Sequence, residues 1–250
     1  MKKSKTRLFI EKKISQNLMI YIKDKQHHFL KNVLRVKLND VITVFDGITG
    51  EWGSQVISIS KDKTALKIEK KIREFETQPD IWLIFAPIKL FRLNITIQKA
   101  VELGVSRFIP CKTEFSNFDK LNYKNLELNA IEAAQQSERL DVPRIEKIID
   151  LNSMLKDFPD DRALVFCDES GPDLPSIYDV VKSNLNNYLK WSVIIGPEGG
   201  FSVEERELIK KHKNVLCVSL GSRILRSDTA AISSLFCIQS IVDKRQPVLK

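Results

Sequence analysis

The most informative segment of this chain is Trp191-Ser-Val-Ile-Ile-Gly-Pro-Glu-Gly-Gly200. Its first half is a continuous apolar run, which is typical of a parallel strand covered on both faces. Its second half holds three glycines, where the backbone can turn sharply and approach a ligand closely. The pattern therefore predicts a buried strand that ends in a loop. From the residues alone, that loop is either a structural turn or a ligand-binding loop.

A second strand interrupted by glycine follows along the chain. The apolar run at 215–220 continues into Gly-Ser-Arg-Ile-Leu-Arg226. Two such strand ends in one α/β domain are where this architecture usually binds small molecules. We expect Ile224 and Leu225 to be buried and to fix the direction of Arg226, because fixed arginines commonly clamp phosphates or carboxylates. A surface lead-in to the next helix is the alternative.

Several other ligand classes lack support in the sequence. The glycine loop is neither G-x-G-x-x-G nor G-x-x-x-x-G-K-[ST], which argues against dinucleotide and triphosphate binding. The four cysteines lack metal-ligand spacing, and we expect reduced thiols. His27 and His28 are adjacent, so on a helix they would point in different directions. We therefore predict no metal site.

Strands alternate with helices from residue 81 onward, which predicts an α/β architecture. Ser202 and Glu205 have the spacing of a capping box at the start of a helix. We predict strands at 81–86, 107–110, 163–167, 191–195 and 215–220, and helices that end at Gly104, span 126–138, follow Ser202 and span 229–242.

The first part of the chain has a different pattern. Five short strand candidates lie at 6–10, 18–22, 41–45, 51–59 and 64–69, and Asp24 is a candidate cap for a helix to about Val36. This composition predicts a small β-barrel. The polar segment 73–79 ends in proline and reads as a linker, so we predict domains at 1–73 and 79–250.

Charge separates the two parts as well. Residues 1–75 carry 17 Lys/Arg against 8 Asp/Glu, whereas the remainder is almost neutral with 23 against 24. A basic module on a neutral body indicates binding to a polyanion such as RNA, although a lysine-rich solvated surface has the same composition. The N-terminus lacks a signal-peptide core and no apolar run is long enough to span a membrane, so we expect a cytoplasmic protein.

Together these segments resemble the SPOUT superfamily of knotted methyltransferases and, within it, the RsmE family. The resemblance covers nearly the whole chain. It rests on Arg7-Leu-Phe, on 27–36 with 44–47, on Ile97-Gln-Lys-Ala-Val-Glu-Leu-Gly-Val, and most specifically on the two glycine segments already quoted. It implies a trefoil-knotted α/β methyltransferase domain preceded by a small PUA-like β-barrel domain.

The resemblance also implies a function and a site. Members methylate N3 of a uridine in small-subunit (16S) ribosomal RNA, as part of ribosome biogenesis, with S-adenosylmethionine as cofactor, no metal, and a homodimer as the working form. The implied catalytic residues are Arg226, Arg7 and Glu198. The implied cofactor contacts are Ile195, Gly196, Glu198, Gly199, Gly200, Leu220, Gly221, Ile224, Leu225, Thr229 and Ala230, and the RNA contacts are Arg7, His28, Lys31, Arg35, Lys89 and Arg139.

The chain departs from the family pattern at three positions. The resemblance leads us to expect Glu where Gln135 stands, Gly where Glu138 stands and Glu where Asp228 stands. The first two departures weaken any catalytic role for that helix end. Two alternatives to the main hypothesis stay open: an enzyme that methylates a ribose 2′-oxygen or another base, and a ribosome-binding factor with a vestigial cofactor pocket. Whether the substrate is free RNA or an assembled small subunit also stays open.

Overall fold

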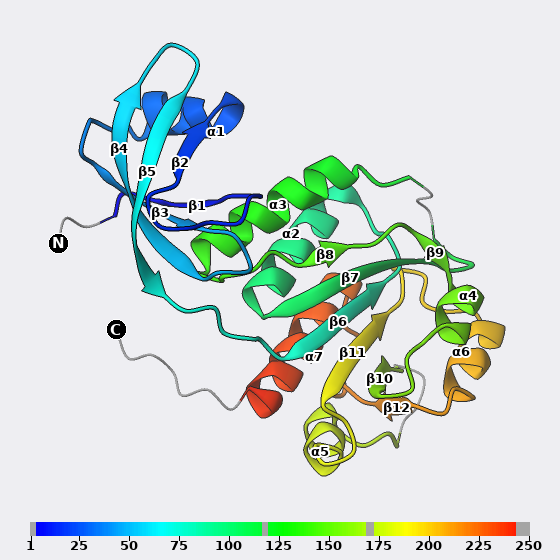
Figure 1. Cartoon of the computed structure of the whole chain (residues 1–250). Coiled ribbons are helices and arrows are strands. Elements are labelled where there is room, and N and C mark those ends of the chain that lie inside the picture. The colour runs from blue at the N-terminus through cyan, green and yellow to red at the C-terminus, as the bar shows by residue number, and fades with distance from the viewer. Residues whose placement is uncertain (1–3, 117–119, 169–172, 244–250) are drawn as a thin grey trace. The chain divides into compact units, whose positions relative to one another are not determined.

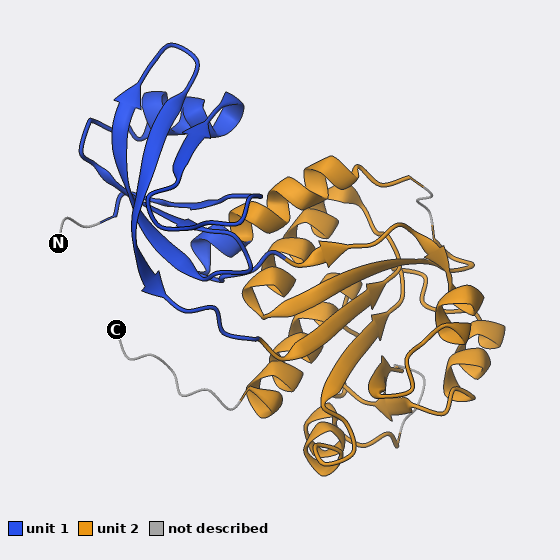
Figure 2. Ribbon diagram, viewed as in Figure 1, with its two compact units in different colours: residues 1–77, 134–142 blue, residues 78–133, 143–250 orange. Residues whose placement is uncertain are grey.

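A computed structural model describes residues 4–116, 120–168 and 173–243 of the chain. These residues form two compact units (Figure 2). Unit 1 contains residues 1–77 and 134–142, and unit 2 contains residues 78–133 and 143–250. The second segment of unit 1, 134–142, had no signal in the sequence that we recognised.

Unit 1 is built on a five-stranded sheet with the strand order β1-β3-β4-β5-β2. β1 pairs with β3 in parallel, and the other neighbours are antiparallel. In β5, Leu66 and Ile68 enter the core while Lys67 and Glu69 face outward, the alternation of a strand with one buried face. The bounds are β1 Arg7–Phe9, β2 Met19–Ile22, β3 Val41–Phe45, β4 Glu51–Ile59 and β5 Thr64–Arg73.

The turn between β3 and β4 is organised by Asp46. The Asp46 carboxylate accepts hydrogen bonds from the backbone amides of Ile14, Ile48 and Thr49. Burial alone would raise the pKa of Asp46, but these hydrogen bonds together hold it below its usual value.

The helix of unit 1 differs from the prediction. It begins at Asp24, with Lys23 at the N-cap position and no side-chain cap. Asp24 therefore lies inside the first turn, so the predicted cap was wrong. The α-helix α1 (Asp24–His28) ends early and continues as the π-helical turn η1 (Phe29–Val33).

Unit 2 is built on a seven-stranded sheet in which every described pair of neighbours is parallel. The order is β12-β10-β11-β6-β7-β8, and β9 also pairs with β7. The strands are β6 Asp80–Phe85, β7 Val105–Lys112, β8 Arg144–Ile145, β9 Ile149–Asp150, β10 Arg162–Cys167, β11 Lys190–Ile195 and β12 Val215–Val218. Four of the five predicted strands are confirmed, and the fifth, β12, ends two residues early.

Helices cover both faces of this sheet, which explains its continuous apolar strands. α4 (Leu151–Lys156) and α6 (Val203–Lys210) pack together on one face, over a core that includes Ile194 and Phe166 (Figure 1). α7 (Ser227–Val242) packs with α2 (Leu90–Glu102), α5 (Ile177–Ser183) and β11 on the other. α3 (Tyr123–Gln136) starts in unit 2, and its last residues belong to unit 1.

Local signals in unit 2 are confirmed where they rest on backbone chemistry. Gly104 follows α2 with φ +88°, a conformation that favours glycine. Ser202 and Glu205 form the predicted capping box at the start of α6. The α/β class is therefore confirmed. The knot stays a prediction, because strand order alone does not establish threading.

Among the described residues, no helix is both long enough and apolar enough to cross a membrane.

Candidate functional site

A cavity of about 220 Å³ opens at the carboxyl ends of β10 and β11. This is the edge of a parallel sheet where α/β folds bind ligands. The glycine loop, residues 196–200, forms one wall and the segment before α7 forms another. The lining residues are Phe166, Cys167, Asp168, Ile195, Gly196, Pro197, Glu198, Gly200, Phe201, Arg206, Ile224, Leu225, Arg226, Ser227 and Ala230.

A second cavity of about 320 Å³ adjoins the first and shares Cys167, Asp168, Ile224, Leu225 and Ala230 with it. The loop after β12 supplies the other wall, through the segment 218–223. Within this loop Gly221 has φ +111°, where a residue with a side chain would be strained. The two glycine-broken strand ends therefore meet around one pair of adjoining cavities, as the sequence predicted.

The glycine loop is held from both sides. A Cβ atom at Gly196 would lie 2.9 Å from the ring of Phe201, so this glycine lets the ring pack beneath the loop. The Ser227 hydroxyl donates to the Gly196 carbonyl at 2.6 Å, which ties the loop to the start of α7. Gly200 has φ +73° and lets the chain turn toward α6.

Gly199 stays a predicted cofactor contact, and its packing gives a further reason for glycine at this position. It lines neither cavity, and a Cβ atom there would meet Phe115 at 3.2 Å. Its missing side chain therefore allows close packing against the segment after β7. Thr229 also lines neither cavity. The remaining nine residues expected to contact a cofactor each line at least one of the two cavities.

The segment before α7 corrects a second expectation. Ile224 is 84% exposed rather than buried, and Leu225 is half-buried. Arg226 is exposed, lines the first cavity and takes the N-cap position of α7. Its direction is therefore set by the backbone of the helix start more than by buried neighbours. Glu198 is exposed on the facing loop.

Asp168 is a site residue that the sequence analysis missed. It follows β10, lines both cavities and is only 4% exposed. Lys210 lies 2.8 Å from its carboxylate and Arg206 lies 3.8 Å away, both on α6. The hydrogen bond to Asp168 raises the pKa of Lys210. The sequence did offer one signal for Asp168, which is its position directly after an apolar run. Polar residues at that position reach the edge of a parallel sheet where ligands bind.

Arg206 connects Asp168 to the glycine loop. Its Nε donates to the Phe201 carbonyl at 3.2 Å, and its Nη1 approaches Asp168. One guanidinium thus links the end of β10 to the end of the loop. Asp168 and Arg206 lie far apart in the sequence, so the local sequence does not predict this contact.

Cys167 lines both cavities, and burial keeps its thiol protonated. Burial raises its pKa to about 12, so the thiol is protonated at neutral pH. It contacts the hydroxyl of Ser234 on α7 at 3.2 Å. All four cysteines are free, as expected.

A third cavity, of about 690 Å³, lies elsewhere in unit 2, beside the start of α6. Four carboxylates line it: Glu114, Asp150, Glu204 and Glu205. Such a lining repels a polyanion. The Glu205 carboxylate already accepts hydrogen bonds from the backbone amides of Ser202 and Glu114. Among the described residues, no group of three or more His, Cys, Asp or Glu side chains could hold a metal ion.

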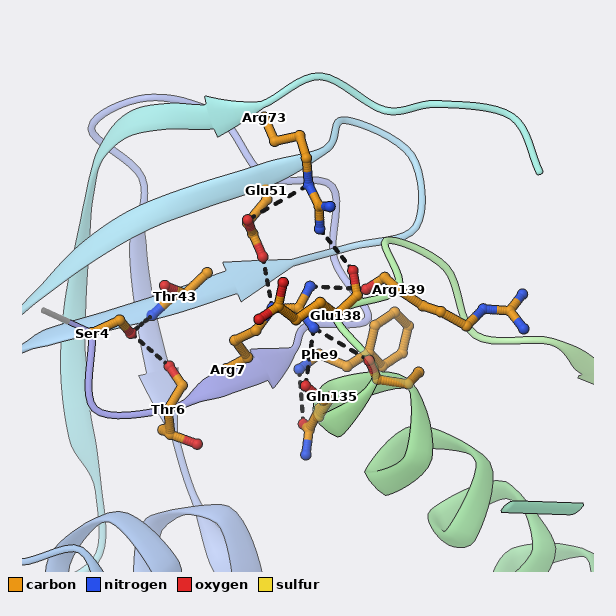
Figure 3. Close-up of polar contacts among 11 residues, drawn as sticks. Ser4, Thr6, Arg7, Phe9, Thr43, Glu51, Arg73, Gln135, Glu138 and Arg139 are labelled. Atoms are coloured by element: carbon orange, nitrogen blue, oxygen red, sulfur yellow. Dashed lines mark hydrogen bonds and ion pairs between the residues drawn. The ribbon is translucent and has the colours of Figure 1, made fainter. Parts of the chain in front are cut away.

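Arg7, expected at the reaction site, is bound inside unit 1 (Figure 3). Its Nε lies 2.6 Å from Glu51, and its two terminal nitrogens donate to the carbonyls of Ala134, Gln135 and Arg139. The carbonyls of Ala134 and Gln135 belong to the last turn of α3, where a cation is favoured by the helix dipole. The guanidinium also lies over the ring of Phe45, 4.6 Å from its centre. This geometry favours a structural role for Arg7 over a catalytic one.

The departures at 135 and 138 fall in the same cluster (Figure 3). The side-chain oxygen of Gln135 accepts from the Phe9 amide at 3.0 Å, a bond that a glutamate could also accept. Glu138 has φ +59°, so the Gly implied by the family pattern suits its backbone, and its carbonyl accepts from Arg73. Arg139 is 9% exposed and forms a two-point contact with Asp141, which favours a structural role over RNA contact.

The other expected RNA contacts lie at the surface. His28, Arg35 and Lys89 are exposed, and Lys31 is partly exposed with its ammonium donating to the Ser60 carbonyl. Lys89 takes the N-cap position of α2 in unit 2, whereas the other three lie in unit 1.

Comparison with known proteins identifies a family that this chain matches. An RNA methyltransferase domain model matches residues 76–239, and an RNA methyltransferase PUA domain model matches residues 22–69. Ribosomal RNA small subunit methyltransferase E of Rickettsia conorii is 34% identical, over 92% of this chain and 93% of that protein. The Bacillus subtilis protein of the same name is 31% identical, over 93% and 95%.

Solved structures agree with these relatives. The ribosomal RNA small subunit methyltransferase E of Neisseria gonorrhoeae, bound to S-adenosyl methionine, has a TM-score of 0.83 at 26% identity, covering 94% of this chain and 97% of that one. A putative methyltransferase of Legionella pneumophila, in complex with the cofactor SAM, has a TM-score of 0.83 at 25% identity with the same coverage.

Proposed function

Because the chain belongs to the ribosomal RNA small subunit methyltransferase E (RsmE) family, we propose that it methylates N3 of a uridine in small-subunit ribosomal RNA, with S-adenosylmethionine as methyl donor. One observation carries this proposal most directly: two glycine-broken strand ends meet around the adjoining cavities of unit 2. The names of the relatives supply the ribosomal RNA, and the family resemblance supplies the position on the base.

The two cavities fit such a cofactor in size and chemistry. Together they fall in the range of ordinary ligand pockets. Backbone groups of the glycine loop and of the segment Leu220–Gly221 can contact a base and ribose, and Ile195 and Leu225 give apolar surface. The carboxylate of Glu198 suits a ligand that carries an amino group and a sulfonium, whereas Asp168 is already paired with Lys210 and Arg206. When bound, this cofactor supplies an electrophilic methyl group.

The protein has three tasks in this reaction. It must hold the uridine and the methyl donor close together, because the N3–CH₃ bond forms as the S–CH₃ bond breaks. It must accept the proton that leaves N3, which lies between two carbonyl groups. It must also stabilise the negative charge that develops on the base. The target base has to be unpaired or flipped out to reach the cavity.

Two side chains at the cavity mouth suit these tasks. Arg226 is exposed beside the first cavity and can stabilise the uridine anion. Glu198 faces the same cavity, and either accepts the proton or holds the cofactor. Arg7 does not share this role in our proposal, because its donors are engaged within unit 1.

Unit 1 supplies RNA affinity in this proposal. Residues 1–75 carry all of the excess positive charge, and the PUA domain model matches within them. His28, Lys31 and Arg35 lie at this surface, and Lys89 adds a cation at the start of α2. Contacts of this kind neutralise phosphates and release counterions.

We further propose a homodimer that works in the cytoplasm, where small subunits are assembled. Phe236 on α7 is 59% exposed, and the partly buried Ile232 lies one helical turn before it on the same face. An exposed apolar pair on one helix face suits a two-fold contact. Light scattering that found a stable and fully active monomer would contradict the dimer.

Isothermal titration calorimetry with S-adenosylmethionine, followed by methyl transfer to small subunits, tests the proposal. We expect micromolar-range cofactor binding, and incorporation of label into small-subunit RNA as 3-methyluridine. Failure to bind the cofactor would instead indicate a binding factor with a vestigial pocket, and a labelled ribose would indicate a 2′-O-methyltransferase. The intact glycine loop and the open cavity beside it argue against a vestigial pocket.

A further inference from the structure

A basic surface with one exposed aromatic ring lies at the tip of the β4–β5 hairpin in unit 1. We call it the hairpin-tip patch. All of its members except Lys31, which is partly exposed, are exposed. They are Tyr21, Lys23, Lys31, Lys61, Asp62 and Lys63.

The hairpin tip is held rigidly by the helix beneath it. The buried ring of His27 spans the start of β5, with Nε2 3.2 Å from the Lys61 carbonyl and Nδ1 2.9 Å from the Thr64 hydroxyl. Since a carbonyl only accepts, Nε2 donates to Lys61, and in the neutral imidazole Nδ1 then accepts from the Thr64 hydroxyl. Lys31 donates to the Ser60 carbonyl at 2.9 Å. The tip therefore needs little ordering when it binds a ligand, which favours affinity.

Tyr21 presents its ring to solvent on the edge strand β2. Its side chain is 54% exposed, whereas the next residue, Ile22, fills the core. Lys63 lies over the ring, with Nζ 5.1 Å from the ring centre. A large aromatic side chain in this position contributes little to the core, and it offers a flat surface next to a cation.

Charge at the patch is strongly positive. Four lysines surround a single carboxylate, Asp62. A hydrogen bond from Ser60 lowers the pKa of Asp62, and the charges of Lys63 and Lys23 lower it further. Lys31 uses one of its three donor hydrogens on Ser60, and two stay available.

We propose that the hairpin-tip patch binds single-stranded RNA, with one base stacked on Tyr21 and the neighbouring phosphates on Lys23, Lys61 and Lys63. A base in a duplex is already stacked on both sides, so an exposed ring selects unpaired nucleotides. Stacking tolerates any base, and the lysines contact only the backbone, so this surface adds affinity without sequence choice. The inference rests on the proposed function only in taking RNA as the substrate.

The test is fluorescence anisotropy with the full chain and a labelled oligouridylate of about 12 nucleotides, a length within the usual site size. Tyr21→Ala should weaken binding about 10-fold without changing its salt dependence, since stacking releases no counterions. Tyr21→Phe should restore binding to within about two-fold, because the ring is kept. Lys61→Ala should lower the slope of log affinity against log salt by about 0.7.

The chain offers a matched control. Tyr178 on α5 is 50% exposed and has Lys182 over its ring at 5.4 Å, but it lies in the almost neutral unit 2. Tyr178→Ala should leave oligouridylate binding unchanged. An equal loss in both tyrosine variants, no loss in Tyr21→Ala, or equal affinity for a duplex of the same length would overturn the proposal.

Failure of the proposed function would look different. A protein that binds the oligonucleotide through Tyr21 but transfers no methyl group to small subunits would refute the function and leave the patch in place. A Tyr21→Ala variant with normal methyl transfer and unchanged oligonucleotide binding would refute only the proposed RNA binding at the hairpin-tip patch.

Discussion

At the scale of single residues, partners and exposure separate two arginines that the sequence analysis treated alike. Arg7 donates to three backbone carbonyls and pairs with Glu51. Arg226 lines the first cavity with its side chain exposed. The sequence could not separate them, because the three carbonyl partners of Arg7 lie more than 120 residues away in the chain.

Arg226→Ala tests the proposed anion stabilisation. Methyl transfer in a single turnover should slow by roughly 100-fold or more, the usual effect of removing one charge-stabilising donor. Cofactor and RNA affinities should stay near those of the unaltered protein. Arg223→Ala is the control, because Arg223 lies in the same loop but lines only the second cavity. An equal rate loss in both variants would remove the special role of Arg226.

Glu138→Gly tests the strained backbone after α3. Position 138 has φ +59°, where glycine lacks the steric penalty of other residues. The variant should therefore raise the free energy of unfolding by about 1 kcal/mol. Glu132→Gly, on the exposed side of the same helix, should lower it by about as much. Thermal denaturation of both variants measures these changes in the free energy of unfolding. A Glu138→Gly variant that is less stable than the unaltered protein would contradict the proposed strain at position 138.

At the scale of elements, apolar runs located the buried strands of unit 2 well, since a strand covered on both faces leaves a continuous signal. Glycine and capping signals located Gly104 and the start of α6. The helix near Asp24 was placed less well, because Asp24 lies within the first turn and the helix changes to a π-helical turn at Phe29. Site residues that depend on distant partners, such as Asp168 and Arg206, had little local signal.

Arg206→Met tests the link between α6 and the glycine loop. Arg206 joins the Phe201 carbonyl to Asp168, so its loss should loosen the loop and weaken S-adenosylmethionine binding about 10-fold. Lys210→Met is the matched control, since Lys210 also pairs with Asp168 but lines neither cavity. Calorimetry should find the control within about two-fold of the unaltered protein. Equal affinity for all three proteins would show that the link is unimportant.

At the scale of the whole molecule, charge and chemistry are divided between the two units. The basic excess lies in residues 1–75, whereas both adjoining cavities lie in unit 2. Composition predicted this division. It could not predict that 134–142 belongs to unit 1, because that segment joins through contacts such as Arg7 with Gln135. The domain boundary at 73–79 stays a prediction from the sequence.

Lys31→Ala tests this division. The variant should bind small-subunit RNA more weakly and with a smaller salt dependence, since one phosphate contact is lost. The methylated position should not move, because phosphate contacts do not choose the base. Filter binding at several salt concentrations, with mapping of the modified nucleotide, measures both. A shifted methylation site would mean that unit 1 selects the base.

The most direct test of the central claim is mass spectrometry of nucleosides from small-subunit ribosomal RNA of a strain that lacks the gene. We predict that 3-methyluridine disappears, and that it returns when the unaltered gene is supplied but not when the gene encodes Arg226→Ala. Unchanged 3-methyluridine, or the loss of a different methylated nucleoside in its place, would contradict the proposed function.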